Sequence, residues 1–173
     1  MRKRSSILRG VFAILSVLLL SLCWTLKVGA DGYVEPVVAR QVVAEAWLKE
    51  KNIEVPPDIK AICREKGDEY GISEYMLEAL IYRESRFKAT AENGPCKGLC
   101  QVNTTYFPHN WRDPEANIDT ACQVILQIVD QYGAEDLGDI LSYYHGEGKP
   151  GYSGYTKGID EISVKLMEAD GVY

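Results

Sequence analysis

The sequence predicts a mainly α-helical fold, built as one domain behind a distinct N-terminal segment. Apolar residues recur at intervals of three and four from residue 33 onwards, as they do on the buried faces of helices. Capping and helix-breaking residues divide this pattern into separate helices. No stretch shows the alternation of apolar and polar residues expected of a half-buried strand. The 173 residues suffice for one domain of ordinary size.

Residues 1–30 have the composition of an export signal. The first ten residues carry four basic side chains, and residues 11–26 form an almost wholly apolar run. Small residues then precede Asp31, as a signal peptidase requires. At about 16 residues the run is shorter than the roughly 20 that span a bilayer. We therefore interpret 1–30 as a signal peptide, with an uncleaved, membrane-associated N-terminal anchor as the alternative. Both predict an exported, extracytoplasmic protein, secreted or associated with the cell envelope.

The remaining chain is strongly acidic. Five of the 19 Lys and Arg residues lie in positions 2–27, so 14 remain beside 25 Asp and Glu. Nucleic-acid binding requires clustered basic side chains, so this balance argues against nucleic acid as a partner. It also gives no electrostatic steering towards an anionic cell wall. Attraction to such a substrate would have to come from a cleft.

Four cysteines follow the N-terminal apolar run. They are Cys63, Cys96, Cys100 and Cys122. An even number of cysteines in an exported chain predicts two disulfides, for which three pairings exist. Two alternatives remain open: the thiols stay free, or Cys96 and Cys100 supply two ligands of a zinc site. Neither His109 nor His145 belongs to a paired histidine motif, which counts against the zinc alternative.

Six helices are predicted from the periodicity and its punctuation. They cover residues 33–52, 59–70, 74–87, 113–133, 136–144 and 155–168. Asp58 and Ser73 are predicted to cap the second and third helices, and Gly71 to end the second. Asp113, followed by proline, opens the fourth. Residues 91–113 contain glycine, proline and aromatic residues without a sustained period, which predicts a loop with a short helical turn.

Two boundaries divide the chain into three parts. After the signal, residues 31–57 are expected to form a helical extension, which ends where Pro56 and Pro57 interrupt the helix. Residues 58–173 are expected to form the single domain that carries the function.

Glu84 does not fit the charge pattern of its helix. It follows Leu77, Leu80 and Ile81 by seven, four and three residues, which places its carboxyl group on or beside the buried face. Loss of hydration raises the pKa of such a group, so it can hold a proton near neutral pH and protonate a glycosidic oxygen. The alternative is a helix-end glutamate paired with a nearby cation such as Arg86.

Several short motifs around Glu84 resemble those of the soluble lytic transglycosylases, relatives of goose-type lysozyme. They span roughly residues 58–168 in the family's order. Each motif by itself is weak evidence for the resemblance. Their occurrence in this order and at this spacing is strong evidence. The motifs are Glu84-Ser85 within residues 80–87, similar to E-S; G-L-C-Q-V at 98–102, similar to G-L-M-Q-I; Asn117-Ile118, similar to N-I; L-S-Y-Y-H-G at 141–146, similar to A-A-Y-N-A-G; and 155–159, similar to Y-V-x-x-V.

The resemblance implies a single lysozyme-like domain with a substrate cleft, and roles for five residues. Glu84 would be the catalytic acid and then the base. Ser85 would orient the acid or a substrate group, Gln101 would bind the sugar chain, and Tyr155 would close the groove. Tyr143 would reach towards the carboxyl group or the bound N-acetyl group. Each of these four residues also has a purely structural alternative. Ser85 would be a helix-end hydroxyl bonded to the backbone, Gln101 a polar loop residue, and both tyrosines packing residues.

Three positions depart from the family's pattern. Cys100 replaces the usual methionine and, with Cys96, suggests a local cross-link in the cleft loop. Tyr144 stands in place of asparagine, so any contact made by that amide is lost or replaced. His145 occupies a position that is usually small. These changes affect substrate contacts more than the chemistry.

The resemblance implies cleavage of the MurNAc-β-1,4-GlcNAc bond in peptidoglycan glycan strands by one carboxylate. The sugar's N-acetyl oxygen would assist departure of the leaving group, and Glu84 would then deprotonate the O6 hydroxyl to close a 1,6-anhydro ring. The loop acids Glu92, Asp113 and Glu115 have no spacing that singles out a second catalytic carboxylate. The resemblance implies that this reaction requires no metal and no cofactor. A lysozyme-type hydrolase of the same bond is the alternative.

Two alternative hypotheses involve no catalysis: the chain is a glycan-binding domain that uses the same groove, or it is an exported, disulfide-rich adhesin. A domain that only binds has no need for a desolvated acid, which counts against the first. Small members of such families serve wall turnover, secretion, conjugation and phage entry, and a cell-envelope assembly partner accompanies some of these uses. The sequence does not indicate which of these uses applies to this protein.

Overall fold

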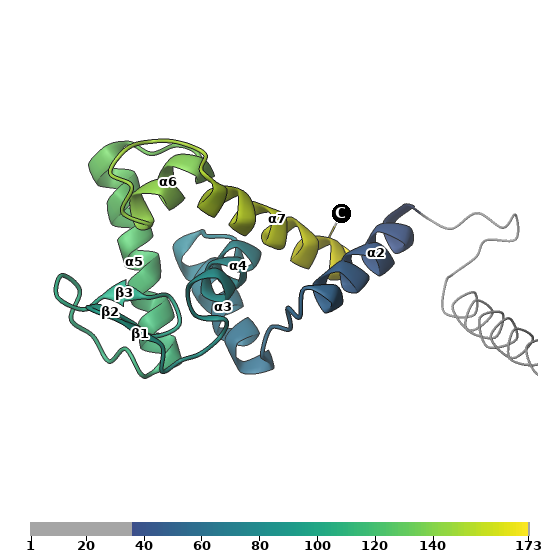
Figure 1. The fold of residues 1–173 in the computed structure, drawn as a ribbon, viewed down its shortest axis with the longest axis horizontal. Helices are drawn as coiled ribbons and strands as arrows, with labels where there is room; N and C mark the ends of the chain where they lie inside the picture. The colour runs from purple at the N-terminus through teal and green to yellow at the C-terminus, as the bar shows by residue number, and fades with distance from the viewer. Residues whose placement is uncertain (1–35, 173) are drawn as a thin grey trace, which may run out of the picture.

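The computed structural model describes residues 36–172, and this part of the chain is mainly helical, which confirms the predicted fold class (Figure 1). The predicted signal peptide and the start of the predicted extension lie outside the described residues. The elements are α2 (Pro36–Glu50), α3 (Pro57–Tyr70), α4 (Glu74–Ser85), β1 (Glu92–Asn93), β2 (Cys96–Lys97), β3 (Val102–Asn103), α5 (Pro114–Tyr132), α6 (Leu137–Tyr144) and α7 (Gly154–Ala169).

A small antiparallel sheet, which the sequence did not predict, lies between α4 and α5. The strand order is β1-β2-β3, with Asn93 opposite Cys96 and Cys96 opposite Asn103. Each strand has two residues, which is too short for an alternating pattern to register in the sequence. The sheet gives the predicted loop a defined path beside the site described below.

The helix starts agree with the predicted caps in part. The prediction that Asp58 caps the second helix is wrong, because α3 begins at Pro57 with Pro56 as its N-cap. Proline suits a first helical position, where its missing N–H would have no partner. Ser73 is the N-cap of α4 but makes no capping hydrogen bond with its side chain. Asp113 caps α5 as predicted, accepting a backbone N–H at 3.2 Å.

Helix α4 lies at the centre of the core. Residues 75–81 are all buried, and the helix packs against both α3 and α7 (Figure 1). A helix that is apolar around most of its circumference requires cover on several sides. The packing fixes the axis of α4, and with it the position of the last turn, where Glu84 lies.

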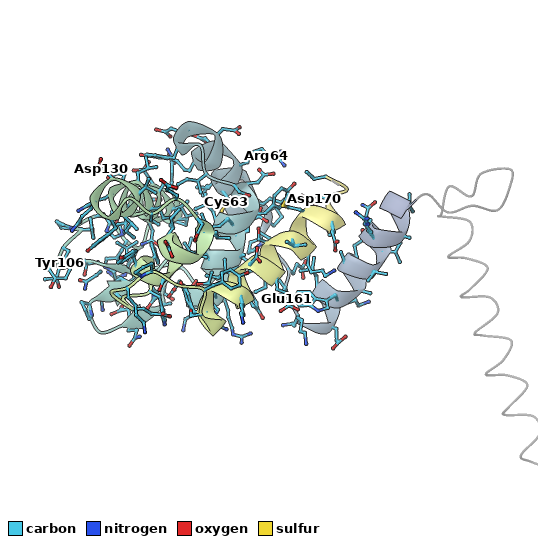
Figure 2. The ribbon with its side chains drawn as sticks, turned by 90° about the horizontal axis from the view of Figure 1, so that it is seen from above. Cys63, Arg64, Tyr106, Asp130, Glu161 and Asp170 are labelled. Carbon is cyan, nitrogen blue, oxygen red and sulfur yellow. The ribbon has the colours of Figure 1, made fainter. Side chains whose placement is uncertain are left out.

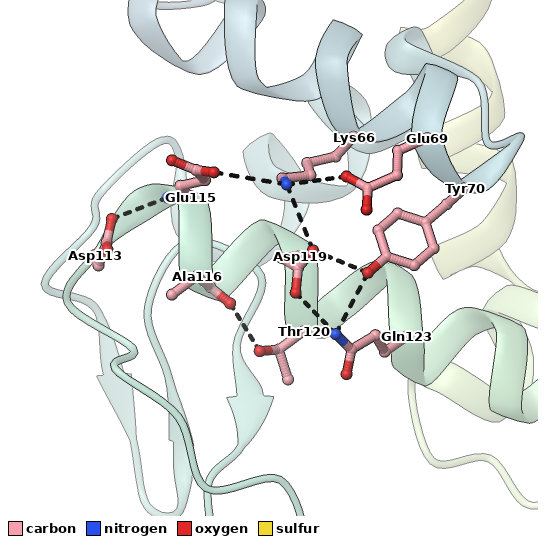
Figure 3. A network of polar contacts seen from close by, with 9 residues as sticks. All are labelled: Lys66, Glu69, Tyr70, Asp113, Glu115, Ala116, Asp119, Thr120 and Gln123. Atoms are coloured by element: carbon pink, nitrogen blue, oxygen red, sulfur yellow. Dashed lines mark hydrogen bonds and ion pairs between the residues drawn. The ribbon is translucent and has the colours of Figure 1, made fainter.

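A polar network joins α3 to α5 (Figure 3). The buried ammonium group of Lys66 lies 3.0 Å from the Glu69 carboxylate and 3.6 Å from those of Glu115 and Asp119. The Tyr70 hydroxyl donates a 2.9 Å hydrogen bond to Asp119. A buried cation is costly unless it is paired, so these acids stabilise the contact between the two helices.

The N-terminal helix α2 packs along α7, so the first and last described helices are adjacent (Figure 1). Ala44 and Leu48 are buried, and the Gln41 amide donates to the Ala169 carbonyl at 2.8 Å. Tyr106 lies at the opposite end of the molecule from α2 (Figure 2). Among α2 to α7, none has the length and apolar composition needed to cross a bilayer.

The two predicted disulfides are wrong, because all four cysteines of the described chain are free thiols. Cys63 on α3, Cys122 on α5 and Cys100 after β2 are fully buried and pack as small apolar side chains. Burial raises the pKa of the Cys122 thiol to about 12. Cys96 is only half-buried and borders a cavity. A Cys96–Cys100 link therefore fails because one thiol belongs to the cleft and the other to the core.

Candidate active site

The last turn of α4 presents Glu84 at the edge of the core. The helix ends at Ser85 and not at Phe87 as predicted, because Arg86 and Phe87 both adopt left-handed backbone angles, with φ of 53° and 61°. This reversal takes the chain away from the helix axis and opens space beside the last turn. Glu84 is half-buried there.

The Glu84 carboxylate accepts a hydrogen bond from the hydroxyl group of Tyr155. Tyr155 lies in the first turn of α7, and its side chain is buried. Ser153 caps α7, its hydroxyl oxygen accepting the Tyr155 N–H at 3.2 Å, which fixes the tyrosine's place on the helix. The contact between α4 and α7 thus brings together two predicted site residues that are 71 positions apart.

Opposing effects set the acidity of Glu84. Burial raises the pKa of the carboxyl group above its ordinary value, and this is the largest effect. The hydrogen bond from Tyr155 and the charges of His145 and Arg83 lower it. Burial prevails, so the pKa remains raised. Glu84 therefore holds a proton at a higher pH than an exposed glutamate does.

A cavity of about 500 Å³ lies beside Glu84. It is lined by Arg83, Glu84, Ser85, Arg86, Ala91, Glu92, Asn93, Cys96, Gln101, Tyr144 and His145. A second cavity, of about 460 Å³, shares four of these residues, Cys96, Gln101, Tyr144 and His145. The two cavities therefore adjoin, and together we call them the groove. It is wide enough for a small ligand or part of a chain.

The two ends of the groove differ in chemistry. The first cavity contains charged side chains, Glu84 among them. The second is lined by aromatic rings and neutral amides, including Tyr106, Phe107, Gln127 and Gln131. Tyr143 lies in this second cavity, where its ring stacks on Tyr132 with centroids 4.1 Å apart. Tyr143 thus borders the groove but not the cavity that holds Glu84.

Ser85 and Gln101 line the first cavity, with their polar groups engaged by the protein. The Ser85 hydroxyl donates to the Ile81 carbonyl at 3.1 Å, the structural alternative foreseen for it. The Gln101 amide nitrogen donates to the carbonyls of Gly98 at 2.9 Å and Ala91 at 3.1 Å. These bonds hold Gln101 against the loop between the two cavities.

The loop that carries Gln101 is attached to α5 by Asn117. The buried side chain of Asn117 accepts a hydrogen bond from the Cys100 N–H at 2.8 Å and donates one to the Lys97 carbonyl at 3.1 Å. The same amide nitrogen lies 2.8 Å from Nε2 of His109. A Cβ at Gly98 would lie 2.5 Å from the Asn117 amide, so a side chain there would displace this attachment. The N-I motif pointed to this position without indicating its role.

In the sequence, Tyr144 and His145 stand out only as departures from a motif, yet both line the groove. The Tyr144 hydroxyl donates to the Cys100 carbonyl at 2.8 Å, which joins α6 to the loop. The His145 ring stacks on Tyr155 with centroids 4.0 Å apart and an interplanar angle of 16°. Such side-chain contacts depend on tertiary packing, which local spacing does not reveal.

A second carboxylate is present in the first cavity, but it is engaged elsewhere. Glu92 forms an ion pair with Lys97 and lies 3.6 Å from Arg112. The hydrogen bond from Lys97 lowers the pKa of Glu92. Glu92 is therefore poorly suited to hold a proton, and Glu84 is the acid that the first cavity offers for proton transfer.

Comparison with known proteins relates the chain to a domain family. Residues 61–162, more than half of the chain, match the family model described as Transglycosylase SLT domain. Over 120 residues the chain is 29% identical to the peptidoglycan transglycosylase gp16 of Escherichia phage T7. That match takes in 60% of this chain and 9% of the phage protein, so the chain spans a small part of its relative's length.

Proposed function

The chain belongs to the transglycosylase SLT domain family, and from this premise we propose that it cleaves the MurNAc-β-1,4-GlcNAc bond of peptidoglycan with Glu84 as its single acid and base. The observation that carries the proposal is the half-buried Glu84 carboxyl group, hydrogen-bonded to Tyr155 inside the groove. It combines a raised pKa with access to a ligand.

In the first step, protonated Glu84 donates its proton to the glycosidic oxygen as the bond to C1 of MurNAc breaks. The N-acetyl oxygen of the same sugar stabilises the positive charge that develops at C1. Glu84 is left as a carboxylate, and the Tyr155 hydroxyl group donates a hydrogen bond to it. A charge-assisted bond of this kind is stronger than a neutral one, so Tyr155 stabilises the anion that the step produces.

In the second step, the Glu84 carboxylate removes the proton from the O6 hydroxyl group of MurNAc, and O6 bonds to C1. The products are a 1,6-anhydro-MurNAc end and a free GlcNAc end, and Glu84 regains its proton. No water is consumed, so the two products together have the mass of the substrate. One carboxylate suffices because the substrate supplies its own nucleophile, which agrees with the engagement of Glu92 by Lys97.

The aromatic and amide side chains of the second cavity fit a glycan strand. Tyrosine rings pack against the apolar faces of sugars, and amides bond to their hydroxyl and acetamido groups. The first cavity holds the charged groups and the reacting bond. A strand lying along both cavities would pass Gln101 and His145, which border each of them.

An extracytoplasmic location belongs to the same proposal, because peptidoglycan lies outside the cytoplasmic membrane. Its support is the basic and apolar composition of residues 1–30. Fractionation of cells that produce the full chain tests it. Recovery of the protein in the cytoplasmic fraction would contradict export.

The mass of the released muropeptides tests the proposed reaction. Isolated sacculi are digested with the full chain, and the soluble products are analysed by mass spectrometry without prior reduction. Anhydro ends, lighter by one water than reducing ends, are expected. Reducing ends would instead identify a hydrolase, and binding without any release would identify a glycan-binding domain.

A further inference from the structure

His145 lies where three parts of the site meet. Its ring stacks on Tyr155, it lines both cavities, and its charge acts on Glu84. Tyr155 in turn donates to Glu84. The imidazole, the phenol and the carboxyl group therefore form one continuous assembly, whose members come from the end of α6, from α7 and from α4.

Several hydrogen bonds hold the backbone around His145. His145 is the C-cap of α6, and its N–H donates to the Leu141 carbonyl at 2.9 Å. The buried Ser142 hydroxyl lies 2.8 Å from the Lys149 carbonyl and 3.1 Å from the Glu147 carboxylate, which closes the turn that follows. The backbone that carries the imidazole is thus held by helix α6 and this turn, and the ring itself makes its contact by stacking on Tyr155.

We propose that His145 is a positioning residue, whose imidazole ring, stacked on Tyr155, holds the phenol hydroxyl in place on the Glu84 carboxylate. The inference rests on the proposed function in one respect, that Glu84 is the reacting acid. Parallel rings with centroids 4.0 Å apart leave no room for the phenol to tilt towards the imidazole. A small side chain at position 145 would open that face of the Tyr155 ring to the groove.

Charge is a second contribution that His145 makes to Glu84. The groups that act on the carboxyl group are Arg83 from α4, Tyr155 from α7 and His145 from the end of α6. Cys96 on β2, Cys100 after it and Tyr144 on α6 also lie within electrostatic reach of Glu84. Arg83 additionally lies over the Tyr155 ring, 5.7 Å from its centroid. A change at His145 therefore acts through both ring position and charge, and two substitutions separate them.

The test uses the full chain with His145→Phe, which keeps a stacking ring without charge, and His145→Ala, which keeps neither. Lys157→Ala is the matched control, since it removes an exposed cation from α7 two residues beyond Tyr155. Turnover of sacculi is measured against pH, with kcat and KM separated. The titration of the Glu84 carboxyl carbon is followed by ¹³C NMR and assigned with Glu84→Gln.

We expect His145→Ala to lower kcat by about tenfold with little change in KM, because alignment in the reacting state is lost. His145→Phe should restore most of that loss. Both substitutions should move the titration of Glu84, and the basic limb of the pH profile, to higher pH. Lys157→Ala should change neither. Equal loss of kcat in the Phe and Ala variants, or wild-type kcat in His145→Ala, would overturn the positioning role.

The NMR titration separates this inference from the proposed function. If the wild-type protein cleaves no sacculi, the proposed function fails, while the Glu84 signal still reports on His145. Two observations in His145→Ala would support the assembly: a shift of the Glu84 titration, and a change in the Tyr155 ring signals. The change in the ring signals should be absent from His145→Phe. Unchanged Glu84 and Tyr155 signals in His145→Ala would overturn it.

Discussion

Two glutamates of α4, six residues apart, are both shielded from solvent, but their surroundings differ. Glu84 keeps one face to the groove and receives a hydrogen bond from Tyr155. Glu78 is fully buried, and neither of its carboxyl oxygens has a hydrogen-bond partner among the described residues. Burial raises the pKa of Glu78 to about 7, against the lowering effect of Lys60 and Arg64. The first arrangement suits the proposed proton transfer, and the second lowers the stability of the fold when Glu78 is charged.

Glu78 should make the fold less stable as pH rises. Its pKa is about 7 in the folded protein and near the ordinary 4.5 when unfolded, so the folded state binds the proton more tightly. The free energy of unfolding should be greatest below pH 4.5 and fall by about 3 kcal/mol up to pH 7 through this group. Urea unfolding of wild type and Glu78→Gln across this range measures the difference. An identical pH dependence in the two proteins would contradict it.

Tyr155→Phe removes the hydroxyl donor and keeps the ring that stacks on His145. The lost hydrogen bond favoured the charged carboxylate, so the pKa of Glu84 should rise and the basic limb of the activity profile should move to higher pH. We expect kcat to fall by about tenfold or more, because the anion formed in the first step loses its donor. Circular dichroism should show an unchanged fold. Full turnover with an unshifted profile would exclude this role.

At the scale of elements, the groove depends on a loop that has little core of its own. Residues 91–113 carry three short strands and are attached to α5 through Asn117, and to α6 through Tyr144. Buried backbone groups need partners, and the Asn117 side chain supplies them for two, the Cys100 N–H and the Lys97 carbonyl. The loop's contribution to the groove therefore depends on Asn117, a residue of α5 that lines neither cavity.

Asn117→Ala should loosen this loop and cost stability. It leaves the Cys100 N–H and the Lys97 carbonyl without their partner, at about 2–3 kcal/mol for such buried groups. Activity should fall with it, because Gln101 and Cys96 change position in the groove. Asn110→Ala, at an exposed site in the same loop, is the control and should stay within about 0.5 kcal/mol of wild type. Equal stability of the two variants would contradict the attachment.

The sequence predicts elements well where periodicity is long and poorly where structure depends on contacts. Apolar spacing located the helices, and the place of Glu84 on the stripe of Leu77 and Ile81 led to the candidate acid. Two-residue strands leave no periodic signal, and the stacking of His145 on Tyr155 arises only when α6 and α7 meet. The even cysteine count suggested disulfides, whereas three of the thiols fill the core because cysteine also packs as a small apolar residue.

Across the described chain, the first and last helices are in contact. Helix α2 packs against α7, and the Lys60 ammonium group pairs with Asp170, beyond the end of α7, at 2.6 Å. These contacts lie at the end of α7 remote from Tyr155. The helix that carries Tyr155 is thus held at both ends, by α2 at one and by the site at the other. The family match begins at residue 61, so α2 is a support outside the matched region.

If α2 belongs to the same cooperative unit, Leu48→Ala should destabilise the whole protein. Leu48 is buried, and its truncation should cost about 2–4 kcal/mol. Val43→Ala on the same helix is the control, because Val43 is 61% exposed and should change stability by less than about 0.5 kcal/mol. Thermal unfolding should remain a single transition in both. A separate early transition in Leu48→Ala would show that α2 unfolds by itself.

We propose that one carboxyl group, Glu84, carries out both proton transfers. Three glutamine variants, compared by the soluble muropeptides that they release from sacculi, show whether it does. Glu84→Gln is expected to abolish release while the protein still binds sacculi. Glu78→Gln, on the same helix but in the core, and Glu92→Gln, in the same cavity but paired with Lys97, should retain it. Wild-type release by Glu84→Gln, or loss of release in Glu92→Gln with Glu84 intact, would rule out Glu84 as the single acid and base.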